Sequence, residues 1–517
     1  MFDKNNLFVV IDGIDMEFEA WELIRLFFNV DSIHFIHTGD IIEDFVPGSL
    51  LSVKVEKEED TWSCKAFFFP QLTSLGQLKK AQSLEVKPQY FSEKVVTHVE
   101  LTQPGGNLFK SRKILVGSCI IEILSKVTGI QLPYGSLTGV RPVKLAMQCL
   151  KDGLNKPATI SQLIRITGMS QQKAGILFDV AEVEKPYVHS DKKKIHLYIG
   201  IPFCASRCLY CSFTAYPIQR YKELVPAYLQ ALEKEIQVVA EWVNRNHFII
   251  ASVYIGGGTP TAIDAFSMTQ LLTQLNQTFN LENTEFTVEA GRPDTITQDK
   301  LEVMRDHHVS RISINPQTMN LETLRLIGRN HTPDDIEEKF YMARRSGFEN
   351  INMDLIAGLP KEDESMFRYT LDKIEAMAPE SLTVHTMAVK RASRLYEEQE
   401  TFTATSDEIV ETMIEDARKS ALKMGMRPYY LYRQKNILAN LENTGYVKPG
   451  LECLYNIHTM EEKQTILALG AGATSKFIFP ENKKIQRVYN VKEVTQYIDR
   501  IDEMLDRKKK MFEAYER

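Results

Sequence analysis

The hydrophobic pattern from residue 195 to about residue 425 repeats one unit six times: a short apolar run, a loop, and a longer two-faced segment. The short runs have the length of buried strands and cover residues 195–201, 251–257, 285–290, 311–317, 350–358 and 381–389. The longer segments place apolar residues at steps of three and four, which predicts helices over 224–243, 267–279, 297–308, 333–347, 364–377 and 406–425. Strands that alternate with helices run parallel with right-handed crossovers. We therefore expect an α/β fold built on a partial (β/α)6 barrel of the TIM-like kind, with an open doubly wound sheet as the alternative.

Two further regions flank this predicted barrel. Residues 1–190 mix strand patterns, such as 7–14 and 49–55, with helical patterns, such as 113–129 and 170–184, and predict an α+β accessory domain. The barrel domain is expected to span 195–425. Residues 426–517 are aromatic and loop-rich before a final charged helix, which predicts a smaller carboxyl-terminal domain that packs on the barrel or covers its mouth.

Composition and charge narrow the class of protein. The chain has 517 residues, of which 44% are hydrophobic and 25% charged. It is too long for a single hydrophobic core, and we expect two or three globular domains. A net charge of −6 without a long Lys/Arg run argues against nucleic acid as a partner. No segment approaches the roughly 18–20 apolar residues that cross a bilayer, and acidic residues interrupt the amino terminus where a secretory signal would be apolar. The expected location is the cytoplasm.

The cysteines indicate a reducing compartment and one special loop. Seven cysteines, an odd number, do not form a disulfide framework, and those at positions 64, 119, 149 and 453 are most simply small buried side chains. The other three, Cys204, Cys208 and Cys211, fall within eight positions directly after the first predicted barrel strand. Thiolates are the usual ligands of a 4Fe–4S cluster, and three of them leave one iron open to a small molecule. The alternatives are a zinc site with a distant fourth ligand and three unrelated thiols.

Polar or glycine residues follow the other predicted strands at the same end of the barrel. Gly256, Gly257 and Gly258 allow a ligand to approach bare backbone, and Glu289, Gln317 and Asp354 stand at the next strand ends. For each carboxylate the simpler interpretation is a solvated or ion-paired side chain. Because several such residues converge on one mouth, we interpret them together as a binding site.

These motifs carry a resemblance to a known family. CASRCLYC (204–211) matches the CxxxCxxC signature of the radical S-adenosylmethionine (SAM) superfamily. Together with YIGIPFC, GGGTPT, EAGRP, RISINPQ and DLIAGLP, it resembles the oxygen-independent coproporphyrinogen III oxidase group over about residues 195–480. The long amino-terminal region with GSLTGVRP (135–142) is most similar to HemZ-type coproporphyrinogen dehydrogenases.

The resemblance implies cofactors and their residues. The cluster would be held by Cys204, Cys208 and Cys211. Contacts to a first SAM molecule would come from Tyr198, Gly257 and Glu289. Contacts to a second SAM, which lies alongside in some relatives, would come from Tyr210, Gly258, Thr259, Gln317, Arg329, Asp354 and Ala388.

The resemblance also implies a reaction and partners. A 5′-deoxyadenosyl radical would take hydrogen from the propionates of coproporphyrinogen III, which lose CO2 and become the vinyl groups of protoporphyrinogen IX in anaerobic heme synthesis. The electron donor would be a protein such as flavodoxin or ferredoxin. The substrate is thus expected to be a tetrapyrrole.

Two positions depart from the decarboxylating relatives. Those relatives carry a further cysteine where this chain has Phe213, and a histidine where it has Gly200. Heme chaperones and heme-degrading members of the wider group share the phenylalanine, so heme degradation or modification and heme delivery stay open as alternatives.

Several residues are candidates for tetrapyrrole contacts, with a solvated surface loop as the equally simple interpretation. They are Lys390, Arg391, Arg394, Tyr429, Tyr430, Tyr432 and Arg433. His385 is the best-placed heme ligand, although a core histidine is the simpler interpretation. An anion site at Thr138, Arg141 and Lys144 is less favoured than an ordinary helix-start turn.

Overall fold

The structure is a computed structural model of the 517-residue chain. It describes residues 6–37, 40, 42, 45–59, 61–97, 108–213, 215–390, 393–397, 405–481 and 484–516. The chain divides into two compact units, Met1–Glu182 and Val183–Arg517, and each is described by itself.

The amino-terminal unit is built on a five-stranded mixed sheet with the order β2-β1-β3-β4-β5. Its strands are β1 (Leu7–Asp12), β2 (Ile33–Phe35), β3 (Gly48–Glu58), β4 (Thr61–Leu72) and β5 (Tyr90–Thr97). Its helices are α1 (Glu17–Ile24), α2 (Leu75–Gln82), α4 (Leu108–Thr128), α5 (Val143–Lys151), α6 (Lys156–Thr167) and α7 (Gln171–Glu184), the last of which crosses the unit boundary.

Side chains of β1 alternate between two cores because successive residues of a strand point to opposite faces. Leu7 and Val9 pack with α1 and α4 on one face of the sheet. Phe8 and Val10 pack on the other face, over which α2 lies. This unit therefore has a helix-covered sheet of its own.

The second unit contains one curved sheet of eleven strands in the order β14-β15-β13-β12-β11-β10-β9-β6-β16-β17-β18. Its parallel centre consists of β6 (Lys194–Ile201), β9 (Ile249–Gly257), β10 (Glu285–Gly291), β11 (Arg311–Ile314), β12 (Ile351–Ala357) and β13 (Ser381–Thr386). Among the described residues, the outermost strands β14 and β18 do not pair with each other, so the barrel is open. The predicted partial (β/α)6 barrel is confirmed, and its six strands are those that the apolar runs indicated.

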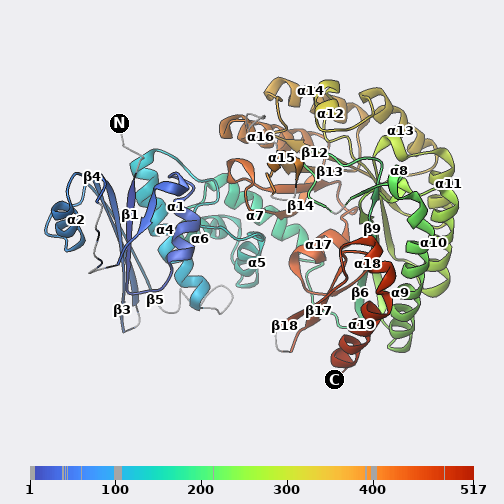
Figure 1. The fold of residues 1–517 in the computed structure, drawn as a ribbon, viewed down its shortest axis with the longest axis horizontal. Helices are drawn as coiled ribbons and strands as arrows, with labels where there is room; N and C mark the ends of the chain where they lie inside the picture. The colour runs from blue at the N-terminus through green and yellow to red at the C-terminus, as the bar shows by residue number, and fades with distance from the viewer. Residues whose placement is uncertain are drawn as a thin grey trace. The chain divides into compact units, whose positions relative to one another are not determined.

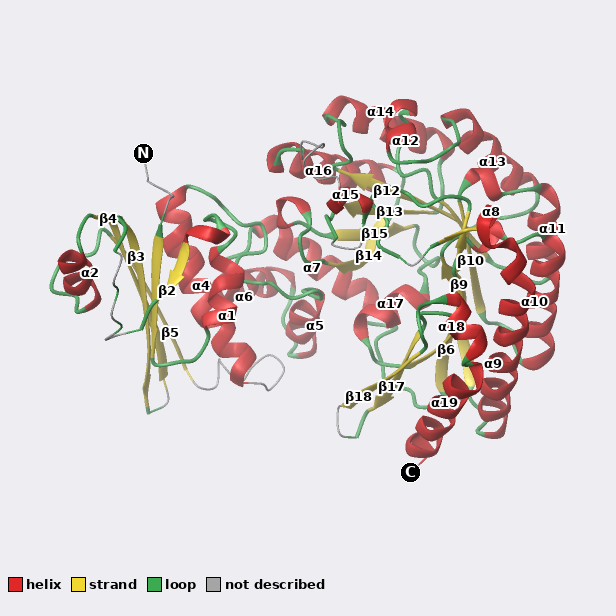
Figure 2. Ribbon diagram, viewed as in Figure 1, coloured by secondary structure: helices red, strands yellow, loops and turns green. Residues whose placement is uncertain are grey.

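Helices cover the outer side of this sheet (Figures 1 and 2). Between the barrel strands run α8 (Ile218–Tyr221), α9 (Val225–Arg245), α10 (Ala265–Thr278), α11 (Gln298–Asp306), α12 (Leu321–Leu326), α13 (Pro333–Arg345) and α14 (Glu364–Met377). After β13 follow α15 (Arg394–Glu397) and α16 (Asp407–Lys423). The two-residue strands β7 (Phe203–Cys204) and β8 (Tyr216–Pro217) flank the cysteine loop.

Residues 426–517 extend the same sheet at both edges. Strands β14 (Arg427–Tyr432) and β15 (Asn443–Val447) continue it antiparallel beside β13, and β16 (Thr465–Leu469) lies parallel to β6. Beyond β16 lie β17 (Thr474–Phe479) and β18 (Lys484–Tyr489), and the helices of this segment are α17 (Leu454–Glu461), α18 (Val494–Asp499) and α19 (Ile501–Glu516). The segment that we expected as a smaller domain thus shares the barrel's sheet and core.

A buried charge network attaches α19 to the barrel. The Nζ of Lys508 lies 2.7 Å from the Oε1 of Glu235 in α9, and both side chains are fully buried. Glu235 also accepts hydrogen bonds from the backbone nitrogen of Gly470, the amide of Asn490 and the hydroxyl of Tyr497. Donors thus contact both carboxylate oxygens of Glu235, so this buried ion pair is also hydrogen-bonded.

Candidate functional site

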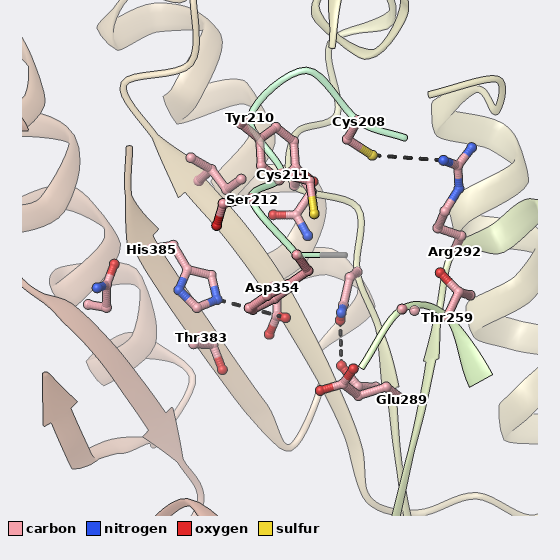
Figure 3. Close-up of a pocket in the computed structure, with 18 of the residues that line it drawn as sticks. Cys208, Tyr210, Cys211, Ser212, Thr259, Glu289, Arg292, Asp354, Thr383 and His385 are labelled. Carbon is pink, nitrogen blue, oxygen red and sulfur yellow. Dashed lines mark hydrogen bonds and ion pairs between the residues drawn. The ribbon is translucent and has the colours of Figure 1, made fainter. Parts of the chain in front are cut away.

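The cysteine loop leaves the carboxyl end of β6 and is tied to the chain around residue 328. Its backbone is held by a hydrogen bond from the nitrogen of Leu209 to the oxygen of Ile327, and the hydroxyl of Ser206 donates to the oxygen of Gly328. Cys204 and Cys208 are buried, and Cys211 is partly exposed. These anchors place all three thiols along one cavity of about 370 Å³ (Figure 3).

Two of the thiols, Cys204 and Cys211, lie in a setting that disfavours free thiolates. Burial raises the pKa of Cys204 to about 12, in spite of a hydrogen bond from the Thr259 hydroxyl at 3.6 Å, and burial also raises the pKa of Cys211. In the described part of the chain, no three His, Cys, Asp or Glu side chains form a group that could hold a single metal ion. A 4Fe–4S cluster requires a different arrangement of ligands from a single metal ion, because each cysteine binds a different iron atom. The donor set, three thiols on one cavity without a fourth, fits such a cluster with one open iron.

Three glycines at the end of β9 form a cradle beside the thiols. A Cβ on Gly258 would lie 2.8 Å from the sulfur of Cys204, and one on Gly256 would lie 3.0 Å from the carboxyl of Glu289. Gly257 adopts a φ of +110°, which side chains other than glycine rarely tolerate. The backbone here therefore lies bare against the cavity, as binding of a ligand through peptide groups requires.

Glu289 on β10 faces this cradle. Its carboxylate accepts a hydrogen bond of 2.6 Å from the hydroxyl of Tyr254, and burial raises its pKa to about 7. Tyr198 lies behind the glycines and does not line the cavity; its ring stacks with those of Tyr254 and Tyr455. Tyr198 therefore supports the three glycines by packing behind them, on the side away from the cavity.

Asp354 on β12 lies opposite Glu289 and has a different electrostatic setting. Burial acts to raise its pKa, but His385 at 3.8 Å and the amide of Asn352 at 2.7 Å outweigh that effect, and the pKa is lowered. Figure 3 shows His385 directed at this carboxylate from β13. Since the hydroxyl of Tyr432 lies 3.3 Å from the Nδ1 of His385, a polar chain runs from Asp354 to the cavity wall.

Gln317 and Arg329 complete the polar lining. Gln317 has a φ of +69° and pairs by backbone hydrogen bonds with β12, while its buried side-chain oxygen has no partner in the described residues. Arg329 donates to the hydroxyl of Tyr210 at 3.1 Å. A buried amide oxygen without a partner is costly, so it is a site where a ligand donor would be favourable.

The structure brings the sequence-predicted residues together, with Tyr198 as the exception among those expected at the cofactors. The lining contains Cys204, Cys208, Tyr210, Cys211, Gly257, Gly258, Thr259, Glu289, Gln317, Arg329, Asp354 and Ala388. Among the residues expected near a tetrapyrrole, Lys390, Tyr430, Tyr432 and His385 also line it. Arg391 lies outside the described residues.

Two of the other expected tetrapyrrole contacts, Tyr429 and Arg433, have structural roles in this fold. The buried Arg433 donates to the backbone oxygens of Leu441 and Asn440, and the hydroxyl of the buried Tyr429 accepts from Asn456. Neither they nor Arg394 belong to the described lining. Sequence reasoning missed Arg292, which lines the cavity behind Cys208. The sequence feature that could have indicated it is EAGRP (289–293). This motif has an arginine directly after the strand, where the strand pattern alone does not require one.

Comparison with known proteins places the chain in a family. Residues 198–374 match the model of the radical SAM superfamily. The chain is 40% identical over 447 residues to the oxygen-independent coproporphyrinogen-III oxidase-like protein HemZ of Bacillus subtilis, covering 86% of this chain and 88% of that protein. It is 30% identical over 311 residues to the heme chaperone HemW of the same organism, covering 59% of this chain and 76% of that one.

Among solved structures, the chain is similar to coproporphyrinogen III oxidase (HemN) from Escherichia coli, a radical SAM enzyme. The identity is 23%, the coverage is 63% of this chain and 73% of that one, and the TM-score is 0.49. In the described part of the chain, no helix is both long and apolar enough to pass through a membrane. On the similarity to HemZ over 86% of the chain and the superfamily match over residues 198–374, this chain belongs to the radical SAM superfamily and, within it, to the oxygen-independent coproporphyrinogen-III oxidase-like proteins.

Proposed function

We propose that this protein is a radical SAM oxidoreductase that decarboxylates the propionates of coproporphyrinogen III without oxygen, giving the vinyl groups of protoporphyrinogen IX. The observation that carries the proposal is the cavity that joins three thiols and two partly buried carboxylates to a wall of tyrosines and one lysine. Membership of the superfamily implies a 4Fe–4S cluster and SAM. The assignments of individual residues to these groups are part of the proposal.

The first cofactors would be bound at the thiol end of the cavity. Cys204, Cys208 and Cys211 would hold the cluster, and the bare backbone of Gly257 with the carboxylate of Glu289 would hold SAM. When bound, these groups supply the 5′-deoxyadenosyl radical that abstracts hydrogen. A second SAM alongside the first would meet a set of residues from the facing strand ends: Tyr210, Gly258, Thr259, Gln317, Arg329, Asp354 and Ala388.

Other parts of the lining suit a flat molecule with carboxylates at its edge. Tyr430 and Tyr432 have parallel rings with centroids 6.3 Å apart, and Lys390 lies beside the exposed ring of Phe213. Burial lowers the pKa of Lys390, so an anionic propionate would favour its charged form. Each propionate would lose a hydrogen atom from its β-carbon, then CO2 and one electron, so two rounds require an external electron acceptor.

The protein would work in a reducing compartment. All seven cysteines are free thiols. We propose the cytoplasm as its location, with a low-potential protein such as flavodoxin or ferredoxin as the electron donor. Burial of Cys204 and Cys208 would limit the access of water and oxygen to the bound cluster.

A second candidate function rests on Phe213. Decarboxylating relatives carry cysteine at this position, and the chain also resembles a heme chaperone at 30% identity. The Phe213 side chain is 65% exposed at the cavity mouth, where it offers a surface to a finished heme. Heme binding and delivery, or radical modification of heme, is therefore the alternative.

A parallel anaerobic assay separates these functions. Reconstituted protein, SAM and a strong reductant are incubated with coproporphyrinogen III or with heme, and products are analysed by mass spectrometry. Loss of CO2 from coproporphyrinogen, absent with Cys208→Ala, is the expected result. Intact coproporphyrinogen beside bound or consumed heme would contradict the decarboxylase and favour the alternative.

A further inference from the structure

Arg292 is a buried cation whose position the strand pattern does not account for. It follows Glu289 by three residues, and its side chain is only 4% exposed. Two of its nitrogens pair with one carboxylate: Nε donates to Oδ1 of Asp294 at 2.9 Å and Nη2 to Oδ2 at 2.8 Å. This two-point contact fixes the plane of the guanidinium and neutralises its charge.

The third nitrogen of Arg292 is directed at the cysteine loop. Nη1 donates to the hydroxyl of Ser206 at 2.7 Å and approaches the sulfur of Cys208 at 3.8 Å. Figure 3 shows this contact, with Arg292 reaching Cys208 from the side of Thr259. The arginine thus connects the end of β10 to the loop that follows β6, from behind the thiol.

A local irregularity of β10 brings Arg292 to this position. The pairing of β10 with β11 shifts register between Glu289 and Gly291, and Gly291 adopts a φ of +64°. The backbone nitrogen of Asn315 donates to the oxygen of Gly291 at 2.7 Å, which fixes the shifted strand end. A bulge re-aims the side chain that follows it. Without the shift, the residue after Gly291 would not continue toward the cysteine loop.

We infer that Arg292 is a positioning residue for the iron–sulfur cluster: through Nη1 it holds Ser206 and donates an N–H···S hydrogen bond to the Cys208 ligand, which favours the reduced cluster. The inference rests on the cluster of the proposed function and not on the identity of the tetrapyrrole.

The physical reason lies in the charge of thiolate ligands. Hydrogen bonds to the sulfurs and the burial of a cluster set its reduction potential, and a donor at a sulfur stabilises the added negative charge on reduction. Asp294 already neutralises the charge of Arg292. Arg292 would therefore affect the reduction potential through one N–H group, which the two-point contact with Asp294 holds in a fixed direction. Residues that orient metal ligands affect retention as well, typically by 10–100-fold.

The test compares four full-length variants after anaerobic reconstitution. Arg292→Met removes the donor, and Arg292→Lys keeps a cation whose single nitrogen cannot serve both Asp294 and Cys208. Ser206→Ala removes the hydroxyl that accepts from Arg292 and donates to Gly328, and it leaves the contact between Arg292 and Cys208 in place. Arg305→Met is the control, because Arg305 also donates from Nε and Nη2 to a nearby carboxylate, through the single oxygen Oδ1 of Asp306, but is exposed on α11. Two quantities are measured: the midpoint potential, by titration monitored with electron paramagnetic resonance, and the rate of iron loss to a chelator.

We expect Arg292→Met and Arg292→Lys to give a more negative potential than wild type and roughly tenfold faster iron loss. Ser206→Ala should speed iron loss with little change of potential, and Arg305→Met should match wild type in both. If Arg292→Met does not fold, Arg292→Lys alone carries the test. A wild-type potential in Arg292→Lys would overturn the inference. A wild-type chain that takes up no iron and sulfide would instead overturn the proposed function, and the inference with it.

Discussion

At the scale of single residues, the cavity places two partly buried carboxylates in opposite electrostatic settings. Burial and the nearby Asp354 raise the pKa of Glu289 to about 7, while His385 and Asn352 lower that of Asp354. Near neutral pH, therefore, Glu289 exchanges its proton and Asp354 stays ionised. A carboxylate poised at the working pH takes its charge most readily when a cationic ligand group arrives.

This difference predicts a pH dependence of SAM binding. If the ionised Glu289 binds the amino group of SAM, affinity falls as pH drops through 7, by up to about tenfold for each pH unit below it. Glu289→Gln should bind more weakly at pH 7.5 and lack this part of the dependence. Equilibrium binding of SAM to both reconstituted proteins, from pH 6 to 7.5, measures the difference.

Parallel pH profiles for the two proteins would remove Glu289 from the SAM site. In the ligand-free protein, ionisation of Glu289 affects folding stability in the opposite direction to SAM binding. A carboxylate whose pKa is raised in the folded state destabilises the fold at the pH values where it is ionised. Glu289→Gln should therefore not lower stability above pH 7. A thermal unfolding scan at pH 8 serves as the control for folding.

Replacement of one cysteine tests the thiol triad. Cys208→Ala should abolish the cluster and all cleavage of SAM, since two thiols do not retain it, while the parallel sheet stays folded. Iron and sulfide analysis with circular dichroism checks both statements. Cys149→Ala is the matched control: Cys149 is buried in α5 and distant in sequence from the loop. Cluster content equal to wild type in Cys208→Ala would contradict the assignment.

At the scale of elements, the site depends on how strand ends are shaped. The glycines after β9 leave room for ligand and sulfur, and the bulge of β10 re-aims the chain beyond Glu289. Both features occur at carboxyl ends of parallel strands, where an α/β barrel collects its ligands. Small backbone changes here should therefore affect the cofactors more than the fold.

Gly258→Ala provides the sharpest test of that expectation. Its Cβ would lie 2.8 Å from the sulfur of Cys204 and 2.6 Å from the backbone oxygen of Phe203, so either the thiol or the backbone must move. We expect reduced cluster content and weaker SAM binding. Gly139→Ala is the control, because nothing lies within 4 Å of the added Cβ and its φ is ordinary. Equal cluster content in both variants would show that the close approach is unimportant.

The elements were more predictable from the sequence than the site's details. The six barrel strands appear where apolar runs placed them, because fully buried parallel strands require such runs. The fourth was predicted to residue 317 but β11 ends at Ile314, because Pro316 and the positive φ of Gln317 cannot continue a strand. Arg292 and the His385–Asp354 pair depend on a bulge and on cross-strand register, which one sequence does not reveal.

At the scale of the whole molecule, every residue of the site belongs to the second unit. Residues just before the first barrel strand have contacts within it: the hydroxyl of Tyr187 donates to Glu452, and Gln464 donates to the oxygen of His189. The amino-terminal unit has its own sheet and cores. The two units should therefore be separable in function.

A fragment of residues 185–517 should fold, take up the cluster and cleave SAM. It keeps the contacts of Tyr187 and His189, whereas a fragment that begins at residue 195 loses both and should be less stable. Iron content, SAM cleavage and thermal unfolding of the two fragments are compared with the full chain. Failure of the longer fragment to bind the cluster would assign the first unit a role in the site.

The decarboxylation itself is tested most directly by isotope transfer. Coproporphyrinogen III deuterated at the β-carbons of its propionates is incubated anaerobically with the reconstituted protein, SAM and reductant. We expect deuterium in 5′-deoxyadenosine and a matching yield of vinyl product, both lost in Cys208→Ala. Unlabelled 5′-deoxyadenosine with intact coproporphyrinogen would contradict the decarboxylation and leave heme as the molecule that this cavity handles.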